Sequence, residues 1–130
     1  MKKDFDGWNR EKKKLNDSVR RPFFKEREIW WCAAGLNVGF EQDGSGRNYS
    51  RPIVVVKGFN KSMFFGVFLT GKRKESRYHM YLGNISGRDS TVVLSQPRLI
   101  DTRRLVRKMA MLDEGIFDVL KARLRHVLLP

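Results

Sequence analysis

Residues 51–70 read RPIVVVKGFNKSMFFGVFLT and contain the two longest apolar runs of the chain. The first run, residues 51–57, is almost entirely apolar, which predicts a strand covered on both faces. Residues 58–61 predict a turn, and residues 63–70 predict a second buried strand. The fold is therefore expected to be built around this pair of strands.

Further short strands are expected on both sides of this pair. They are expected at residues 28–34, 78–82, 90–94 and 105–111. A long glycine-containing loop at residues 35–50, a basic loop at 71–77 and a turn at 83–89 connect them. Pro97 is expected to interrupt the strand pattern within residues 96–101. Several short antiparallel strands indicate a mainly β fold, a small curled barrel with helices appended.

The two helices are expected at the ends of the chain. Phe5, Trp8 and Leu15 lie at helical spacing within residues 2–15, and Asn16 is a plausible stop, so we expect an amphipathic N-terminal helix that packs Phe5 and Trp8 on the barrel. Residues 1–25 are therefore interpreted as a helical extension and linker, and residues 26–130 as the barrel domain.

At the other end, Asp113 is expected to cap a C-terminal helix. The apolar stripe of this helix is expected to consist of Ile116, Leu120, Leu124 and Val127.

The charge of the chain indicates a polyanionic partner. The 130 residues carry a formal net charge of +13, with 41% hydrophobic residues. A globular domain with this excess fits nucleic acid, an anionic membrane surface or an acidic protein. The apolar runs are far too short to span a bilayer, and the charged N-terminus lacks the apolar core of a signal peptide.

Cysteine and histidine usage indicates neither a disulfide nor a metal centre. Cys32 is the single cysteine, which fits a reducing cytoplasm and a small buried residue. His79 and His126 lie apart, His79 in an expected strand and His126 near the end of an expected helix. We therefore expect no metal and no other cofactor.

Arg51 is the strongest candidate for binding a phosphate. Pro52 restricts the residue before it to an extended conformation, which holds Arg51 at the start of a strand. The preceding loop carries Glu41, and a guanidinium fork matches phosphate oxygens in pairs.

An ordered set of motifs makes the sequence more specific than any one of them. Trp30-Trp31 in the first strand is followed by Glu41-Gln42, by Arg51-Pro52 and by Thr70 at the end of a strand. The block Gln96-Pro97-Arg98-Leu99-Ile100-Asp101 comes next, with Arg104 beyond it. This order resembles the MazF/PemK family of toxins from bacterial type II toxin–antitoxin systems, over about residues 26–128.

The resemblance implies an SH3-like barrel that acts as a homodimer. It implies metal-independent cleavage of single-stranded RNA, including messenger RNA, at short sequences. It also implies inhibition by a cognate antitoxin with an acidic, partly disordered tail. The charge of +13 agrees with RNA and with such an antitoxin.

In metal-free cleavage the ribose 2′-OH attacks the adjacent phosphorus, so the protein mainly aligns the reactants and stabilises charge. Arg51 is assigned charge stabilisation, because a guanidinium is a poor proton donor at neutral pH. Thr70 would donate a hydrogen bond to the scissile phosphate, or would only satisfy a backbone group at a strand end. Glu41 is either the base or base-orienting group, or a structural partner of an arginine.

Further residues are candidates for RNA binding. Gln42 would shape the loop or read a base edge, and Arg47 and Tyr49 lie in the same long loop. Lys72 and Arg73 belong to a basic stretch with interleaved aromatic residues, which fits an RNA path or a solvated hairpin loop. Arg98 would either contact RNA or pair with Asp101 beside a turn fixed by Pro97. The second, structural role is the favoured interpretation.

The sequence departs from the PemK-like branch at three positions. That branch has an acid–base arginine and aspartate where this chain has Val93 and Ser95, and a histidine where this chain has Phe40. These differences shift the expected catalytic role to Arg51 and Thr70. Two other hypotheses stay open: a CcdB-like toxin that binds a topoisomerase, and a non-catalytic nucleic-acid-binding barrel.

Overall fold

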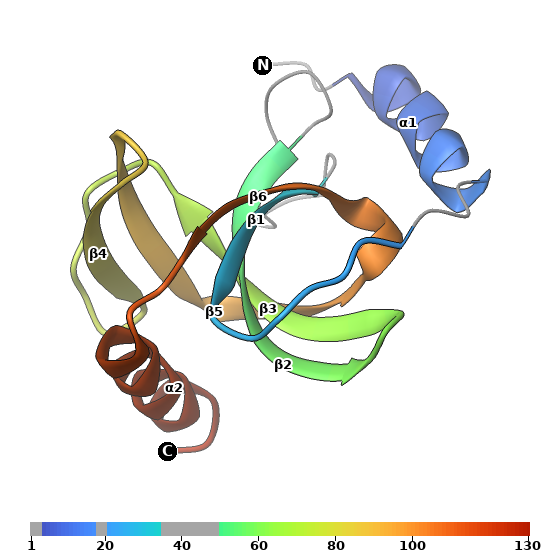
Figure 1. Ribbon diagram of the computed structural model, residues 1–130. Helices are drawn as coiled ribbons and strands as arrows, with labels where there is room; N and C mark the ends of the chain where they lie inside the picture. Colours follow the sequence, from blue (N-terminus) through green and yellow to red (C-terminus); the bar gives the residue numbers. More distant parts are fainter. Residues whose placement is uncertain (1–3, 18–20, 35–49) are drawn as a thin grey trace.

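The computed structural model describes residues 4–17, 21–34 and 50–130. Its regular elements are α1 (Phe5–Asp17), β1 (Glu28–Ala33), β2 (Ser50–Asn60), β3 (Met63–Thr70), β4 (His79–Ile85), β5 (Arg88–Asp101), the 3₁₀ helix η1 (Thr102–Arg104), β6 (Leu105–Met111) and α2 (Glu114–Leu128). The six strands form one antiparallel sheet in the order β4-β5-β3-β2-β1-β6. The expectation of a mainly β barrel with a helix at each end is confirmed (Figure 1).

The sheet is strongly curled (Figure 1). Apolar side chains are buried on both of its faces and form two cores. One core contains Val54, Leu69 and Leu94 and is closed by α2. The other contains Ile53, Phe64 and Ile100 beneath the curl, with Phe24 packed against it. Strands β2 and β3 contribute to both cores, because successive side chains of a strand point to opposite faces.

The central strand β2 is buried on both faces, as its unbroken apolar sequence predicts. Residues 52–56 are all buried. Gly66 of the neighbouring strand β3 allows close packing there, since a Cβ atom would lie 2.8 Å from Ile53 Cδ1 and 2.9 Å from the Val54 carbonyl oxygen. The interior of the sheet therefore requires glycine at this position.

Strand β5 is longer than expected and includes the proline. We expected residues 96–101 to break the pattern, but β5 runs without a break to Asp101. Pro97 lies opposite Val67, beside a register shift between Val67 and Leu69 of β3. Such an irregularity bends a strand and tolerates proline, so β5 continues from one core into the other.

The β4–β5 connection is tighter than expected. We expected a turn over residues 83–89, whereas the turn consists of Ser86 and Gly87 alone. Both residues have positive φ, 51° and 85°. This two-residue conformation matches the twist of antiparallel strands, so the hairpin is extended to Ile85 and Arg88.

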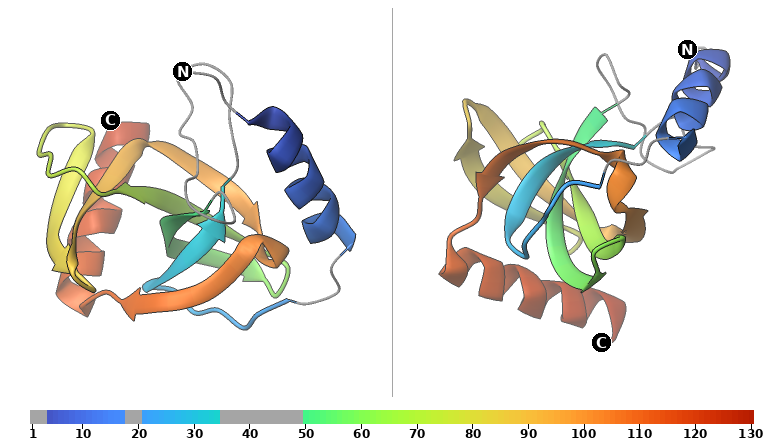
Figure 2. Two further views of the ribbon diagram at one scale, coloured as in Figure 1. Left: turned by 90° about the horizontal axis from the view of Figure 1, so that it is seen from above. Right: turned by 45° about the vertical axis from the view of Figure 1, so that its right-hand side comes forward.

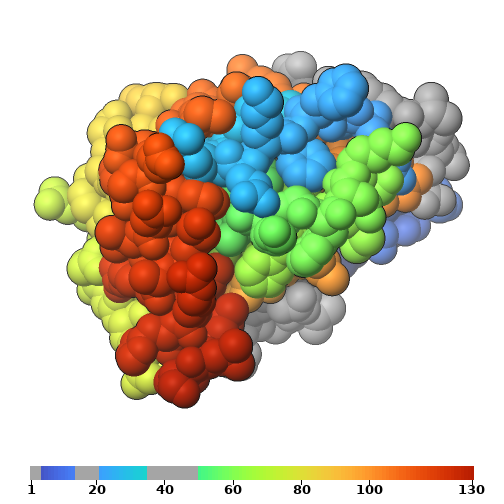
Figure 3. Space-filling view, turned by 60° about the horizontal axis from the view of Figure 1, so that its bottom comes forward, coloured from blue at the N-terminus to red at the C-terminus, as the bar shows by residue number. Residues whose placement is uncertain are grey.

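Helix α2 covers one core and presents its other side to solvent (Figure 3). The Asp113 carboxylate accepts a hydrogen bond from the Ile116 backbone N–H at 3.2 Å, which confirms the predicted cap. Phe117, Leu120 and Leu124 are the buried residues. Ile116 is exposed, so its assignment to the buried stripe was wrong by one position, because the helix meets the sheet along the neighbouring row.

Helix α1 lies on the opposite side of the molecule from α2 (Figure 2). Its Trp8 is 7% exposed, as expected for a residue that packs on the barrel. Phe5 is 49% exposed, so the expectation that it also packs there was wrong. The helix begins with Asp4, whose carboxylate accepts a hydrogen bond from the Gly7 backbone N–H at 2.9 Å.

The segment after α1 is fixed to the barrel by one arginine. The Arg21 guanidinium donates hydrogen bonds to the Ser62 carbonyl, the Thr102 hydroxyl and the Asp101 carboxylate. Asp101 also accepts from Arg103 in an ion pair at 2.9 Å. The side-chain hydrogen bond from Arg103 is the main cause that lowers the pKa of Asp101 from its ordinary 3.8 to about 2. The Arg103 backbone N–H and the charges of Arg103 and Arg21 also lower it, while burial acts in the opposite direction.

Neither helix in the part of the chain that the structure describes is long and apolar enough to cross a membrane.

We predict that the two sides of α2 differ sharply in their effect on stability. Leu120 is fully buried, so Leu120→Ala should lower the free energy of unfolding by about 2–5 kcal/mol. Val119 is 51% exposed, and Val119→Ala should change it by about 0.5 kcal/mol or less. Urea denaturation followed by circular dichroism measures both. Equal losses would contradict the packing of α2 described above.

We also predict a pH-dependent contribution from Asp101. Because its pKa is lower in the folded protein than in the unfolded chain, this contribution is present above about pH 4 and is lost as the pH falls toward 2. Asp101→Asn should cost about 1 kcal/mol at pH 6, a value reduced for its partial exposure, and the difference should shrink to near zero at pH 2.

Denaturation of the wild type and the variant between pH 2 and 6 provides the measurement. Asp118→Asn is the control, since Asp118 is exposed and its ion pair with Lys121 is 3.8 Å long. A constant difference between wild type and Asp101→Asn across this range would contradict the role given to the carboxylate.

Candidate nucleic-acid interface

Arg51 and Thr70 lie at the same end of the central strand pair. β2 and β3 pair as Ile53 with Phe68 and Val54 with Val67. The β2–β3 ladder ends at the pair of Ile53 and Phe68, and continuing its register by two residues, back along β2 and forward along β3, places Arg51 opposite Thr70. The two-residue period of a strand also places both on the sheet face that carries Ile53 and Phe68. Both residues are half-buried, so the structure brings this pair of candidates together.

Thr70 also has a structural interaction. Its hydroxyl accepts a hydrogen bond from the Lys72 backbone N–H at 3.4 Å, close to the upper limit for such a bond. Its partner across the ladder, Thr91, is buried and makes the stronger contact, donating to the Lys72 carbonyl at 2.7 Å. Thr91 therefore holds the start of the basic loop, and the Thr70 hydroxyl, which only accepts in its bond to Lys72, can donate its hydrogen to another group.

Two more arginines lie close to this face. Arg98 of β5 pairs with Gly66 in the ladder, and its guanidinium lies 6.0 Å from the centre of the Phe68 ring. Arg104 donates to the Ala33 carbonyl at 3.3 Å and lies 5.6 Å from the centre of the Trp8 ring. Neither forms an ion pair with a carboxylate within the described ranges.

The electrostatics of these arginines favour an anion. Burial lowers the pKa of Arg104, and the positive charge of Arg98 lowers it further, while Asp101 and Cys32 act in the opposite direction. A guanidinium stays protonated even so, because its ordinary pKa lies far above neutral. The positive charge is therefore partly desolvated and incompletely neutralised, which strengthens its attraction for a phosphate.

The expected pairing of Arg98 with Asp101 was wrong. Asp101 forms its ion pairs with Arg21 and Arg103. Residues three apart in a strand point to opposite faces, so Arg98 and Asp101 diverge. This correction removes the structural explanation for Arg98 and leaves its side chain over Phe68, beside the face that carries Arg51.

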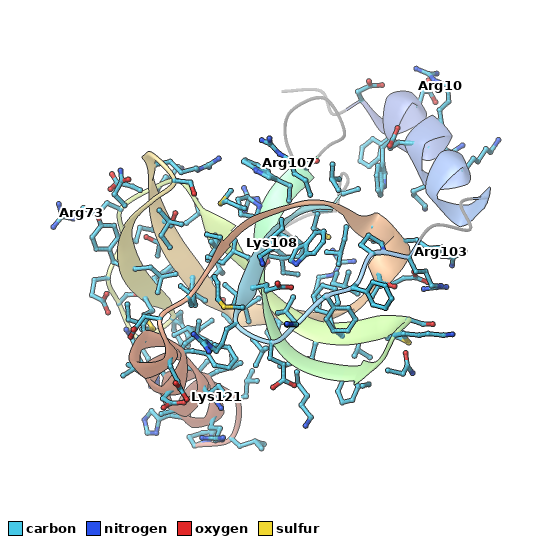
Figure 4. The ribbon with its side chains drawn as sticks, viewed as in Figure 1. Arg10, Arg73, Arg103, Arg107, Lys108 and Lys121 are labelled. Atoms are coloured by element: carbon cyan, nitrogen blue, oxygen red, sulfur yellow. The ribbon has the colours of Figure 1, made fainter. Side chains whose placement is uncertain are left out.

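Some of the remaining candidate site residues lie within the described part of the chain and others lie outside it. Glu41, Gln42, Arg47 and Tyr49 lie outside the described residues, as does Phe40. Lys72 is exposed, and Arg73 stacks on Tyr81 with 4.8 Å between guanidinium carbon and ring centre. Figure 4 shows Arg73 at the margin of the molecule, pointing away from the sheet.

The positions that depart from the PemK-like branch show no alternative acid–base pair. Val93 is buried and pairs with His79 in the ladder, and Ser95 is exposed. His79 is bound through Nδ1 to the Ser76 hydroxyl at 2.9 Å, as fits an ordinary strand histidine. Among the described residues no group of histidine, cysteine, aspartate and glutamate side chains could hold a metal ion.

The buried carboxylate of Glu28 lies on the same sheet face as Arg51, and its oxygens already accept hydrogen bonds from neighbouring residues. Burial raises the pKa of Glu28, but hydrogen bonds from Lys108, Trp30 and the Lys25 backbone lower it below the ordinary value. Its ion pair with Lys108 is 2.8 Å long. Glu28 is therefore charged and structural, and not a candidate base.

Arg104 is the described residue whose importance the sequence did not reveal. The ordered set of sequence motifs includes Arg104 but assigns it no function. Its burial depends on the close approach of α1 and η1, which brings Trp8 to its guanidinium. No spacing within the sequence indicates that contact.

Comparison with known proteins identifies the family. Residues 25–128 match the family model described as PemK-like, MazF-like toxin of type II toxin–antitoxin systems. The match covers most of the chain, and the chain belongs to this family. The comparison with curated proteins found no match.

Solved structures share the fold. MazF from Deinococcus radiodurans has a TM-score of 0.68 at 19% identity, covering 84% of this chain and 97% of the other. An endoribonuclease in complex with its cognate antitoxin, from a Mycobacterial species, has a TM-score of 0.62 at 13% identity, covering 83% and 98%. The Deinococcus MazE–MazF complex has a TM-score of 0.61 at 16% identity, covering 84% and 96%. The sequence-based recognition of the MazF/PemK family is thus confirmed.

We predict that Cys32 is chemically inert in the native protein. It is fully buried, and burial raises the pKa of its thiol to about 12, although Arg104 and Arg98 act in the opposite direction. Because the thiolate is the reactive form, native protein at pH 8 should show no reaction with iodoacetamide over an hour, by mass spectrometry. Protein in 6 M guanidinium chloride is the control and should take up one label. Rapid labelling of native protein would contradict the burial of Cys32.

Proposed function

We propose that this chain is the toxin of a type II toxin–antitoxin system and a metal-independent, sequence-specific endoribonuclease that cleaves single-stranded RNA. The observation that carries the proposal is the β2–β3 register, whose continuation beyond the pair of Ile53 and Phe68 places Arg51 opposite Thr70 on one face of the sheet. Two further arginines without carboxylate partners among the described residues, Arg98 and Arg104, support it by adding positive charge close by.

In the proposed reaction the ribose 2′-oxygen forms a bond to the adjacent phosphorus and loses its proton. The bond from phosphorus to the 5′-oxygen breaks, and that oxygen takes up a proton. The products are a 2′,3′-cyclic phosphate and a 5′-OH end. No water and no metal ion is consumed, so alignment and charge stabilisation are the main tasks of the protein.

Arg51 would donate hydrogen bonds to the non-bridging oxygens, where negative charge accumulates as the 2′-oxygen attacks. The Thr70 hydroxyl would donate its own hydrogen to the same phosphate, because the bond that it accepts from the Lys72 backbone N–H uses only a lone pair. Arg98 and Arg104 would contribute mainly through their charge. Glu41 is the candidate base or base-orienting residue, with Arg47 or Arg51 as its partner in the structural alternative.

The partners proposed for this chain follow from the family and its charge. We propose single-stranded RNA, an acidic cognate antitoxin and a second copy of the chain as partners, in the cytoplasm. The net charge of +13 suits both polyanions. The solved Mycobacterial and Deinococcus relatives that are named as complexes with an antitoxin support the second partner.

We predict that Arg51→Ala strongly slows cleavage while leaving the fold intact. A long single-stranded RNA is incubated with the protein in EDTA, and the ends are mapped. Wild type should give discrete cuts with 5′-OH ends, and Arg51→Ala should be slower by about 10²–10³-fold. Thr70→Val should be slower by about 10-fold, the equivalent of one hydrogen bond to a charged group.

Arg125→Ala is the matched control, since it removes one positive charge from the exposed side of α2 and should cleave like wild type. Tight binding with intact RNA would replace the nuclease by a non-catalytic nucleic-acid-binding barrel. If the protein neither binds nor cleaves RNA but captures a topoisomerase, the CcdB-like alternative is favoured.

A further inference from the structure

Trp31 of β1 has two arginines against its ring. The guanidinium carbon of Arg107 lies 5.9 Å from the ring centre, and that of Arg88 lies 5.2 Å from it. Arg107 is the ladder partner of Trp31 in β6. Arg88 comes from the start of β5, three strands away in the sheet, so the curl of the sheet brings this group together.

The charges of Arg88 and Arg107 are not neutralised within the described part of the chain. Neither side chain forms an ion pair or a hydrogen bond with another described residue. Lys108, the residue after Arg107, shows the contrast, because it points to the other face of β6 and pairs with Glu28 at 2.8 Å. Figure 4 shows Arg107 directed outward on the side of the molecule away from α2.

The cation–π contact with the ring restrains the position of each guanidinium and leaves its N–H groups without a described hydrogen-bond acceptor. An arginine stacked in this way keeps its donors for a planar or tetrahedral anion, and it loses less side-chain entropy when the anion binds. Trp31 is half-buried and therefore forms a rigid base for both arginines. Two guanidiniums held at the same ring suit a phosphodiester.

The neighbouring backbone leaves room for this arrangement. A Cβ atom on Gly71 would lie 2.8 Å from Arg88 Nη2. Gly71 directly follows Thr70, and Trp31 pairs with Pro52, which directly follows Arg51. The Trp31 group is therefore one residue from the Arg51–Thr70 pair along both strands, on the opposite face of the same sheet end.

We infer that Trp31, Arg88 and Arg107 form a phosphate-binding subsite for a nucleotide that flanks the cleaved bond. The inference rests on the proposed function, because it extends the same RNA from Arg51 over the strand ends to the other face. RNA is favoured over an acidic protein because its phosphates repeat along one chain, and this group continues a line that begins at the proposed scissile phosphate.

The test measures binding of a single-stranded RNA in which every ribose carries a 2′-O-methyl group, so that no 2′-OH can attack. Fluorescence anisotropy is recorded from 50 to 300 mM salt. Arg88→Ala and Arg107→Ala should each raise Kd about tenfold at 100 mM and reduce the slope of log K against log salt by about 0.7, as expected for one lost phosphate contact. Arg125→Ala should match wild type.

Two further variants separate oriented stacking from simple charge. Arg88→Lys keeps the charge and loses the planar fork, so it should retain most of the salt slope but bind several-fold more weakly than wild type. Gly71→Ala keeps every charge and displaces the Arg88 guanidinium, so it should also weaken binding. Thermal unfolding of each variant confirms that it is folded.

Each outcome of these measurements either supports or overturns the proposed subsite. If wild type binds and cleaves RNA but Arg88→Ala and Arg107→Ala behave like Arg125→Ala, the subsite is overturned and the proposed function stands. If these two variants lose affinity for a poly-glutamate peptide and not for RNA, the group serves an acidic protein and the inference is overturned. If wild type does not bind RNA at all, both proposals fail.

Discussion

Burial of β2 on both faces is the constraint on which the rest of the structure depends. Residues 53–56 alternate between two cores, with Val54 and Val56 in one and Ile53 and Val55 in the other. A slip of one residue against β3 would exchange the faces of every side chain and would press side chains against Gly66. Because the hydrophobic pattern allows one register, it also sets Arg51 opposite Thr70. The chemistry at the sheet end is thus a consequence of packing in the sheet centre.

The bend in β5 is the second constraint. Before the register shift near Pro97, β5 contributes Val92 and Leu94 to the core beneath α2, and after it, Ile100 to the other core. One strand therefore closes both cores. The same bend sends the two ends of β5 to different places. Arg88 reaches Trp31, while Arg98 lies over Phe68 near the opposite face.

The sequence predicted the parts of the fold that local patterns determine. The unbroken apolar run of β2 predicted burial on both faces, and Asp113 predicted the start of α2, because each signal lies within a few residues. Pro97 was misinterpreted, since only the sheet context shows that a strand irregularity tolerates it. In the buried row of α2, Leu120 and Leu124 were predicted correctly, but Ile116 was chosen in place of Phe117, because both fit an amphipathic helix and the sheet decides between them.

The candidate site also contains features that local sequence patterns predict and features that only the folded chain reveals. The position of Arg51 at the start of a strand could be predicted, because Pro52 restricts its backbone and an apolar strand follows. The expected ion pair between Arg98 and Asp101 does not form, since residues three apart in a β-strand point to opposite faces. Arg104 and the group around Trp31 depend on contacts between elements distant in sequence. Their residues carry no local motif, so only the folded chain reveals them.

The placement of arginines also links stability to binding. Arg98 and Arg104 repel each other, and burial adds a desolvation cost to Arg104. The hydrogen bond to the Ala33 carbonyl and the contact with Trp8 offset part of that cost. An anion held by both arginines would remove the repulsion, and a ligand that binds only the folded chain stabilises it in proportion to its affinity. The same unneutralised charge that weakens the free protein therefore becomes binding energy for a polyanion, and a single acidic substitution beside these residues would improve folding at the expense of binding.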